Sequence, residues 1–278
     1  MLKQGGGIRV KSIFKSFGYV LFYMMFQMVF MSVIAIILQA ADSSLDMEAF
    51  MGRHTMLLAC ASNILTVLAL ILFFRIRKKS LLREINLKPV KPKSYILPCI
   101  AAFTCSMVFS LFTYSMSFNN AAGISSGVEY YSGILPGLGG DIQAVTLLIV
   151  SPVTEEIIFR GLILTALQKR FHWVIAVLVS GLLFGSIHFM AGGTVLVLGA
   201  TVMGIVLGVS FVKTKSILPA IMGHVAANMA DFAIAVLPPL DNMARYILML
   251  AFAAVFAVAL LMLIKDKGSA WLAQSKTP

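Results

Sequence analysis

Residues 146–165 have the sequence TLLIVSPVTEEIIFRGLILT, which is apolar enough to cross a bilayer yet contains Glu155, Glu156 and Arg160. A charged side chain at membrane depth costs about 2.5–3.5 kcal/mol on insertion scales. Such residues usually face the inside of a helix bundle or a wet cavity, where they pair with one another or take part in chemistry. The segment therefore predicts a membrane protein with a polar site in its interior.

The composition of the whole chain also indicates a membrane protein. Of 278 residues, 60% are hydrophobic and 12% are charged, and the mean hydropathy is +0.95. These values are typical of polytopic membrane proteins and not of soluble domains. The net charge of +11 would suit a nucleic-acid-binding protein. No soluble basic domain or RNA-binding motif is present, so we expect no nucleic-acid partner. Three cysteines lie in apolar runs without zinc-ligand spacing, so we expect them to be small buried hydrophobic residues: Cys60, Cys99 and Cys105.

The apolar segments predict an all-α polytopic protein, a bundle of eight transmembrane helices forming one integral membrane domain over 1–278. The first run is too long for the apolar part of a signal peptide, so we expect it to remain as a helix. With both termini in the cytoplasm, every Lys and Arg except Arg53, Arg160 and Arg245 falls in a cytoplasmic segment. This is the positive-inside pattern, and it predicts a multi-pass protein of the cell membrane. The predicted spans are 18–40, 55–74, 95–117, 141–168, 173–190, 194–212, 216–237 and 245–264.

Further polar residues interrupt the fifth and seventh segments. His188 ends the run Phe-Gly-Ser-Ile-His, and His224 and Asn228 are four residues apart, which places them on one helix face. Asp231 continues that face. At 1.5 Å per residue, Glu155, His188 and Asn228 each lie about 20–24 Å from the nearest cytoplasmic helix end. A shared depth predicts that these groups meet near the bilayer centre.

The two glutamates are expected to have different roles. Glu156 and Arg160 are four residues apart with the acid first, the favourable order for an ion pair on a helix. Glu155 points about 100° away from Glu156 and is left without a basic partner. Pro152 removes one helix hydrogen bond nearby, and the resulting distortion would make room for a water molecule beside Glu155.

Taken singly, each of these residues also has a purely structural explanation. The Glu156–Arg160 pair would be structural whatever the function of the protein. Interhelical hydrogen bonding explains His188, His224 and Asn228 equally well, and Asp231 would simply lie near the far interface. Only their combination indicates chemistry.

The combination consists of three motifs, in order on three segments. They are Glu155-Glu156-x-x-x-Arg160, Phe184-x-x-x-His188 and His224-x-x-x-Asn228. At this spacing they resemble the CAAX protease and bacteriocin-processing family, intramembrane endopeptidases similar to the type II CAAX prenyl protease. The resemblance covers residues 141–230.

The resemblance implies an eight-helix bundle that hydrolyses a peptide bond with a glutamate-activated water. Glu155 would be the general base, and His188 would hold or polarise the water. His224 and Asn228 would stabilise the oxyanion, where each preorganised donor contributes about 3–4 kcal/mol. The implied partners are the lipid bilayer and a peptide or membrane-protein substrate. The supporting residues would be Glu156, Arg160 and Phe184.

The favoured mechanism requires no cofactor. The alternative is a catalytic Zn²⁺ held by Glu155, His188 and His224, with water as a fourth ligand. The sequence contains no H-E-x-x-H helix, and the spacing of the three residues does not by itself encode a metal site.

Other functions stay open at this point. The main alternative is a non-enzymatic protein, such as a bacteriocin-immunity factor or a membrane interaction partner. A proton-coupled transporter is less favoured, because no inverted repeat or pair of broken helices is present. The sequence lacks the nucleophile motif of a serine intramembrane protease and the second intramembrane aspartate of an aspartyl one. The sequence does not identify the substrate, its prenylation, the oligomeric state, or a role for Asp231 or for the loop at 118–140.

Overall fold

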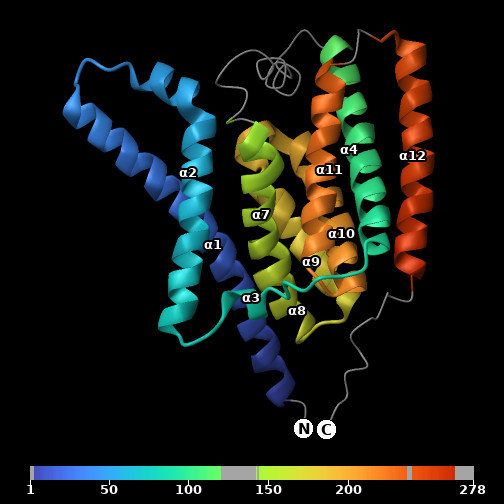
Figure 1. Cartoon of the computed structure of the whole chain (residues 1–278), viewed down its shortest axis with the longest axis horizontal. Helices are drawn as coiled ribbons and strands as arrows, with labels where there is room; N and C mark the ends of the chain where they lie inside the picture. The colour runs from blue at the N-terminus through green and yellow to red at the C-terminus, as the bar shows by residue number, and fades with distance from the viewer. Residues whose placement is uncertain (1–2, 120–141, 143, 237–239, 267–278) are drawn as a thin grey trace.

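The computed structural model describes residues 3–119, 142, 144–236 and 240–266, and within these ranges the chain is helical and contains no β-strand. The predicted all-α class is confirmed for this part of the chain (Figure 1). The loop predicted at 118–140 lies almost wholly outside the described residues.

In the described residues, helices lie in the predicted apolar segments, and the number of eight membrane spans stays a prediction. Five helices of this part of the chain are long and apolar enough to cross a bilayer, over Ile13–Ala41, Met47–Ile76, Lys93–Thr113, Thr194–Thr214 and Asn242–Lys265, as expected of a multi-pass membrane protein. The long helices are α1 (Lys3–Ala41), α2 (Met47–Ile76), α4 (Lys93–Asn119), α10 (Phe189–Thr214) and α12 (Asn242–Lys265). The shorter helices are α3 (Leu81–Glu84), α9 (Trp173–Ile187) and α11 (Leu218–Val236).

The segment with the two glutamates is one helical rod made of four pieces. These are η1 (Thr146–Val150), α7 (Ser151–Glu156), η2 (Ile157–Leu164) and α8 (Thr165–Gln168), where η denotes π-helix. π-Helix is rare and concentrates at functional sites. Side-chain hydroxyl groups bond to two carbonyls of η2: Ser180 Oγ donates to Phe159 O at 3.1 Å, and Thr165 Oγ1 donates to Arg160 O at 3.1 Å. Packing by neighbouring residues therefore supports the wider turns.

Two helix starts follow directly from the local sequence. Asp46 caps α2 by accepting a hydrogen bond from Ala49 N at 3.0 Å. Asp241 caps α12 in the same way, from Ala244 N at 2.7 Å. In each case a carboxylate satisfies one of the backbone N–H groups left free at a helix start.

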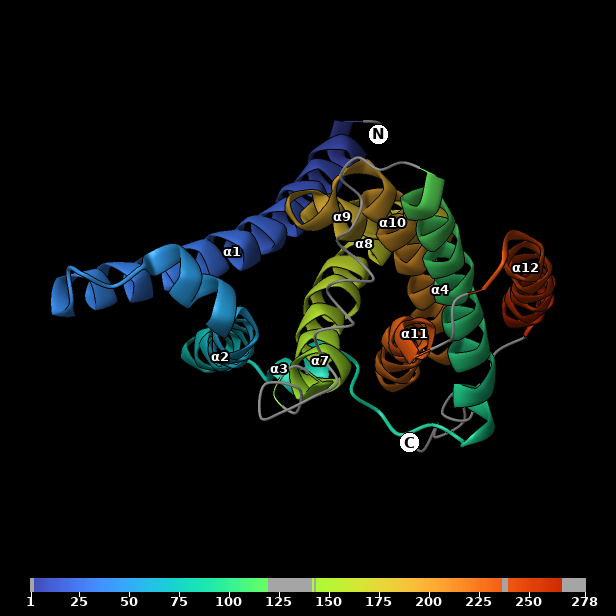
Figure 2. The same cartoon turned by 90° about the horizontal axis from the view of Figure 1, so that it is seen from above.

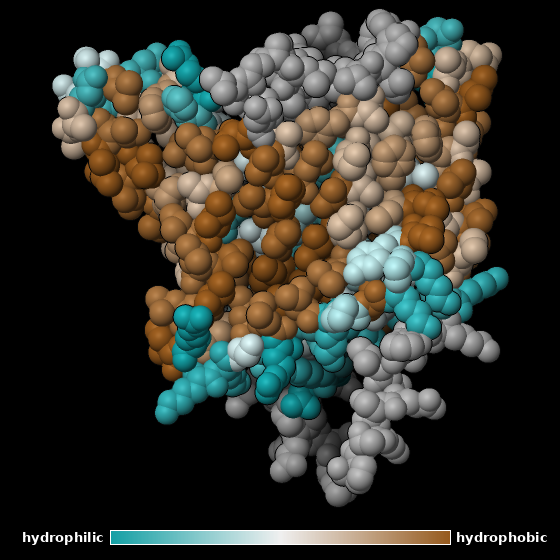
Figure 3. All heavy atoms as spheres, viewed as in Figure 1, coloured by the Kyte–Doolittle hydropathy of each residue, from teal (hydrophilic) through white to brown (hydrophobic). Residues whose placement is uncertain are grey.

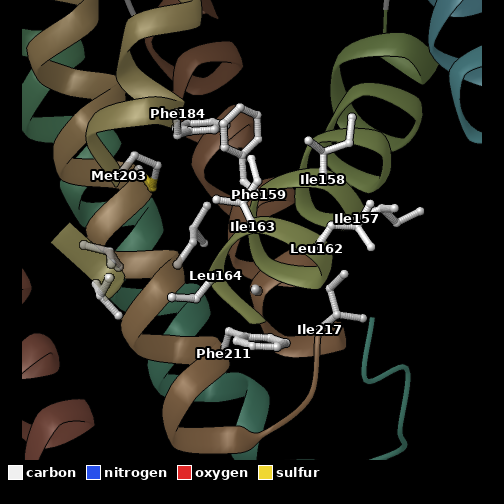
Figure 4. Close-up of a cluster of buried hydrophobic side chains, with 14 of the residues drawn as sticks. Ile157, Ile158, Phe159, Leu162, Ile163, Leu164, Phe184, Met203, Phe211 and Ile217 are labelled. Carbon is white, nitrogen blue, oxygen red and sulfur yellow. The ribbon is translucent and has the colours of Figure 1, made fainter. Parts of the chain in front are cut away.

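The rod occupies the middle of the bundle (Figures 1 and 2). In both views α1 and α2 lie on one side of it, and α4, α11 and α12 lie on the other. The closest helix partners are α4 with α11 and α12, α9 with α10, and α1 with α2. Figure 4 shows the apolar core around η2, where Phe159 and Ile163 meet Phe184 of α9 and Met203 of α10.

Helices α9 and α10 form an antiparallel hairpin joined by the single residue His188. A Cβ atom added to Gly181 would lie 2.7 Å from Ile205, and one added to Gly185 would lie 1.9 Å from Thr201 Oγ1. Glycine is therefore required for this close approach. The sequence placed the end of this segment at residue 190 and the next start at 194, whereas the helix ends at Ile187 and its successor starts at Phe189.

Basic residues gather at one end of the bundle. Lys213, at the end of α10, donates to the carbonyl of Ile264 at the end of α12. Lys169, which follows α8, pairs with Glu84 at 4.0 Å. Figure 3 shows hydrophilic residues at this lower end, below a broad hydrophobic belt. This segregation is what the positive-inside orientation requires, and the cytoplasmic placement of both termini stays a prediction.

Candidate active site

Glu156 and Arg160 form the ion pair expected from their spacing. Arg160 Nη1 lies 2.7 Å from Glu156 Oε1, and both side chains are fully buried. Arg160 Nη2 also donates to the carbonyl of Gly204 at 3.0 Å, and the guanidinium lies 4.7 Å from the centre of the Phe184 ring. The arginine thus joins η2 to both helices of the α9–α10 hairpin.

Gly204 makes this contact possible through its lack of a side chain. A Cβ atom there would lie 2.9 Å from Gly181 Cα and 3.2 Å from the Phe184 ring. Because α9 and α10 touch at this point, the Gly204 carbonyl is within reach of the guanidinium. The bonded carbonyl and the ring replace part of the hydration that Arg160 loses on burial.

His224 of α11 lies between the two glutamates. Its Nδ1 is 3.0 Å from Glu156 Oε1, and its Nε2 is 3.8 Å from Glu155 Oε2. Glu156 is already paired with Arg160, so it is a carboxylate and can only accept a hydrogen bond. The Nδ1 of His224 therefore carries the hydrogen, and in the neutral form of the ring the unprotonated Nε2 is directed toward Glu155.

Glu155 is the less buried of the two acids, with 13% of its side chain exposed against 0% for Glu156. No hydrogen bond to Glu155 is present among the described residues. The separation of roles expected for the glutamates thus has a geometric counterpart: Glu156 is bonded to Arg160 and His224, whereas Glu155 faces His224 at a distance too long for a direct bond.

His188 is held at the reversal between α9 and α10. Its Nδ1 lies 2.9 Å from the carbonyl oxygen of Phe184. A carbonyl only accepts, so Nδ1 carries the hydrogen and Nε2 is left as an acceptor in the neutral ring. The Phe184 ring contacts three predicted site residues: its centre is 4.8 Å from the ring of His188, 5.7 Å from that of His224 and 4.7 Å from the Arg160 guanidinium.

Asn228 lies one turn beyond His224 but bonds elsewhere. Its Nδ2 donates to the carbonyl of Leu147 in η1 at 2.6 Å, which leaves one of the two amide hydrogens for another acceptor. Asp231 bonds to α4, where Ser106 Oγ donates to Asp231 Oδ1 at 3.1 Å and Ser110 Oγ donates to the same oxygen. Asp231 therefore joins α11 to α4.

The donor atoms do not form a ready zinc site. In the part of the chain that the structure describes, no three His, Cys, Asp or Glu side chains are arranged to hold a metal ion. Of the three ligands considered from the sequence, Glu155 and His224 face one another. His188 and His224 each contact the Phe184 ring, and no direct contact joins the two histidines among the described residues. These residues do not fit a three-ligand centre as they stand.

The sequence interpretation missed a second polar group, contributed by the first two segments. Tyr23 of α1 donates to Asn63 Oδ1 of α2 at 3.2 Å, and Asn63 Nδ2 donates to Ser151 Oγ of α7 at 3.2 Å. Gln27 of α1 shares a helix face with Tyr23. An asparagine within the apolar run 55–74 was the available signal.

Comparisons with known proteins find similarity to membrane peptidases. The family model described as "Type II CAAX prenyl endopeptidase Rce1-like" matches residues 141–230, the stretch that supplies η1 to the first part of α11. Over this stretch the match supports the resemblance to the CAAX protease and bacteriocin-processing family.

A curated relative from Bacillus subtilis (strain 168), named "Putative membrane peptidase YdiL", is 33% identical over 121 residues. The match covers 38% of this chain and 47% of the relative, so the chain spans less than half of that protein. No solved structure matches significantly. Both matches are to membrane peptidases, in agreement with the long apolar helices described above.

Proposed function

We propose that this protein is an intramembrane endopeptidase in which Glu155 activates the water that attacks a peptide bond of a peptide or membrane-protein substrate. The observation that carries the proposal is the position of His224, whose two ring nitrogens face Glu155 and Glu156 from a different helix. The family match and the relative named as a membrane peptidase support the same reaction class.

Glu155 and His224 are suited to hold the attacking water between them. The Glu155 Oε2 and His224 Nε2 atoms are 3.8 Å apart. Two acceptors at this separation can bind one water molecule, each through one of its hydrogens, at ordinary distances of about 2.8 Å. His188 Nε2 supplies a further acceptor on the α9 side for the water or for a substrate N–H group.

In the proposed step, Glu155 takes a proton from the water, and the oxygen of the water bonds to the carbon of the scissile carbonyl. The remaining amide hydrogen of Asn228 stabilises the resulting oxyanion. When the C–N bond breaks, protonated Glu155 gives the proton to the leaving amine nitrogen. Because His224 Nδ1 bonds to Glu156, the Nε2 of the neutral ring acts as an acceptor in this step, and oxyanion stabilisation by His224 stays a prediction.

Glu156, Arg160 and Phe184 support this arrangement without touching the substrate. Glu156 fixes the tautomer and direction of His224, and Arg160 holds Glu156. The Phe184 ring packs against Arg160, His188 and His224. The proposed step uses no metal ion. We therefore expect chelation by 1,10-phenanthroline to leave cleavage unchanged.

The test is comparative peptidomics of cells that carry the wild type, Glu155→Gln or Glu48→Gln. Glu48 is an exposed acid at the start of α2 and provides the matched control. Removal of a general base typically costs about 10²–10⁴-fold in rate. We expect cleavage products that depend on the wild type, persist with Glu48→Gln and disappear with Glu155→Gln. Normal cleavage by a folded Glu155→Gln variant would contradict the proposal. Bacteriocin protection that survives this change would favour the non-enzymatic alternative.

A further inference from the structure

A chain of polar side chains joins α1 and α2 inside the bundle. Asn63 Oδ1 accepts from Tyr23 Oη at 3.2 Å and from Gln27 Nε2 at 3.3 Å. Gln27 also accepts from Ser62 Oγ and donates to Thr66 Oγ1 at 3.5 Å. Tyr23 and Asn63 are 8% and 4% exposed, so the chain is inside the protein and not at its lipid-facing surface.

The polar chain continues to the rod that carries Glu155. Asn63 Nδ2 donates to Ser151 Oγ at 3.2 Å. Ser151 and Glu155 are four residues apart on α7, so they share a helix face one turn from one another. Tyr23 is also close enough to Glu155 for the hydroxyl and the carboxylate to interact electrostatically. The α7 face that carries Ser151 and Glu155 therefore lies near α2, and Glu155 also faces His224 of α11.

We propose that Tyr23, Asn63 and Ser151 are positioning residues that set the direction of the Glu155 carboxylate toward His224. Ser151 accepts from Asn63, so its own hydroxyl hydrogen remains available on the face that it shares with Glu155. Tyr23 and Asn63 fix the position of Ser151 and thereby the rotation of α7. The expected change in kcat rests on the proposed function. The direction of the Glu155 carboxylate rests on the hydrogen bonds alone.

The charged and titratable groups around Glu155 come from several elements. His224 lies on α11, Glu156 and Arg160 lie on the rod itself, and Tyr23 lies on α1. Removing only the Tyr23 hydroxyl leaves the other groups unchanged. Interhelical hydrogen bonds of this kind contribute little individually to membrane-protein stability. A specific effect on Glu155 can therefore be separated from general destabilisation.

The test compares Tyr23→Phe with Tyr19→Phe, the same change one turn earlier on α1, where no hydrogen bond to Asn63 exists. Both proteins are assayed as full chains in proteoliposomes, with folding checked by thermal unfolding. We expect Tyr23→Phe to lower kcat about fivefold, the value of one ordinary hydrogen bond, with KM unchanged and the acid limb of the pH profile displaced. Ser151→Ala should act in the same direction, and Ser151→Thr, which keeps a hydroxyl, should restore the wild-type values.

A second measurement does not depend on cleavage. The infrared carboxyl band of Glu155, identified by its absence in Glu155→Gln, is titrated in each variant. We expect its midpoint to move in Tyr23→Phe and to stay at the wild-type position in Tyr19→Phe. Equal midpoints in the two variants would overturn the inference. A midpoint that moves in Tyr23→Phe, together with a wild type that cleaves no peptide, would instead overturn the proposed function and leave the positioning role intact.

Discussion

Replacement of Arg160 by Met is the most direct test of the buried polar cluster. The guanidinium makes an ion pair of 2.7 Å with Glu156, a bond of 3.0 Å with the Gly204 carbonyl and a ring contact of 4.7 Å with Phe184. Methionine has a similar length and fills the space with an apolar chain. It leaves the Glu156 carboxylate buried with only His224 as partner. Breaking a buried pair in this way costs about 3–5 kcal/mol of unfolding free energy.

The double variant distinguishes a stranded charge from lost packing. In Glu156→Gln/Arg160→Met the buried carboxylate is also gone, so we expect the double variant to be about 2 kcal/mol more stable than Arg160→Met alone. Unfolding is followed by reversible titration with SDS in mixed micelles. The control is Lys169→Met, which removes a basic residue from an exposed pair with Glu84 and is expected to cost less than about 1 kcal/mol. A strictly additive double variant would refute the electrostatic explanation.

Two further outcomes are expected. Gly185→Ala should destabilise the α9–α10 hairpin by about 1–3 kcal/mol, because the added methyl group would lie 1.9 Å from Thr201 Oγ1. Gly52→Ala, where nothing lies within 4 Å, is the matched control in thermal unfolding. Ser44→Ala should raise the pKa of Asp42 toward its ordinary value of 3.8, because the Ser44 hydroxyl and N–H hydrogen bonds lower it. Since these bonds favour the carboxylate, they stabilise the turn above that pH and lose their effect as the pH falls through the lowered pKa, which an NMR titration would follow.

Helical period accounts for the parts of the site that the sequence could predict. The spacing of Glu156 and Arg160 predicted their ion pair, because residues four apart on a helix are neighbours. The same period separated Glu155 from that pair. The prediction that the three segments meet depended on the equal depth of Glu155, His188 and Asn228 and on the resemblance to a known family, since neither feature is encoded in a single helix.

Tertiary packing determined the parts that could not be predicted. The π-helical turns of η1 and η2 depend on bonds from other helices, such as the Ser180 hydroxyl on the Phe159 carbonyl. The direct passage from α9 to α10 at His188 depends on glycine contacts between the two helices. Asn63 lies in an apolar run, and only the positions of α1 and α7 reveal what it bonds to. Each case requires knowing which helices are adjacent.

The length of α1 makes the site responsive to bilayer thickness. Its apolar part has 29 residues and rises about 43 Å at 1.5 Å per residue, against a hydrocarbon thickness of about 30 Å. A helix of this length tilts to fit, and Figure 1 shows α1 inclined to α4, α7 and α12. In shorter-chain lipids α1 must lean further. Tyr23 and Gln27 move with it, so the acyl-chain length of the host membrane becomes a variable that acts on the hydrogen bonds to Asn63.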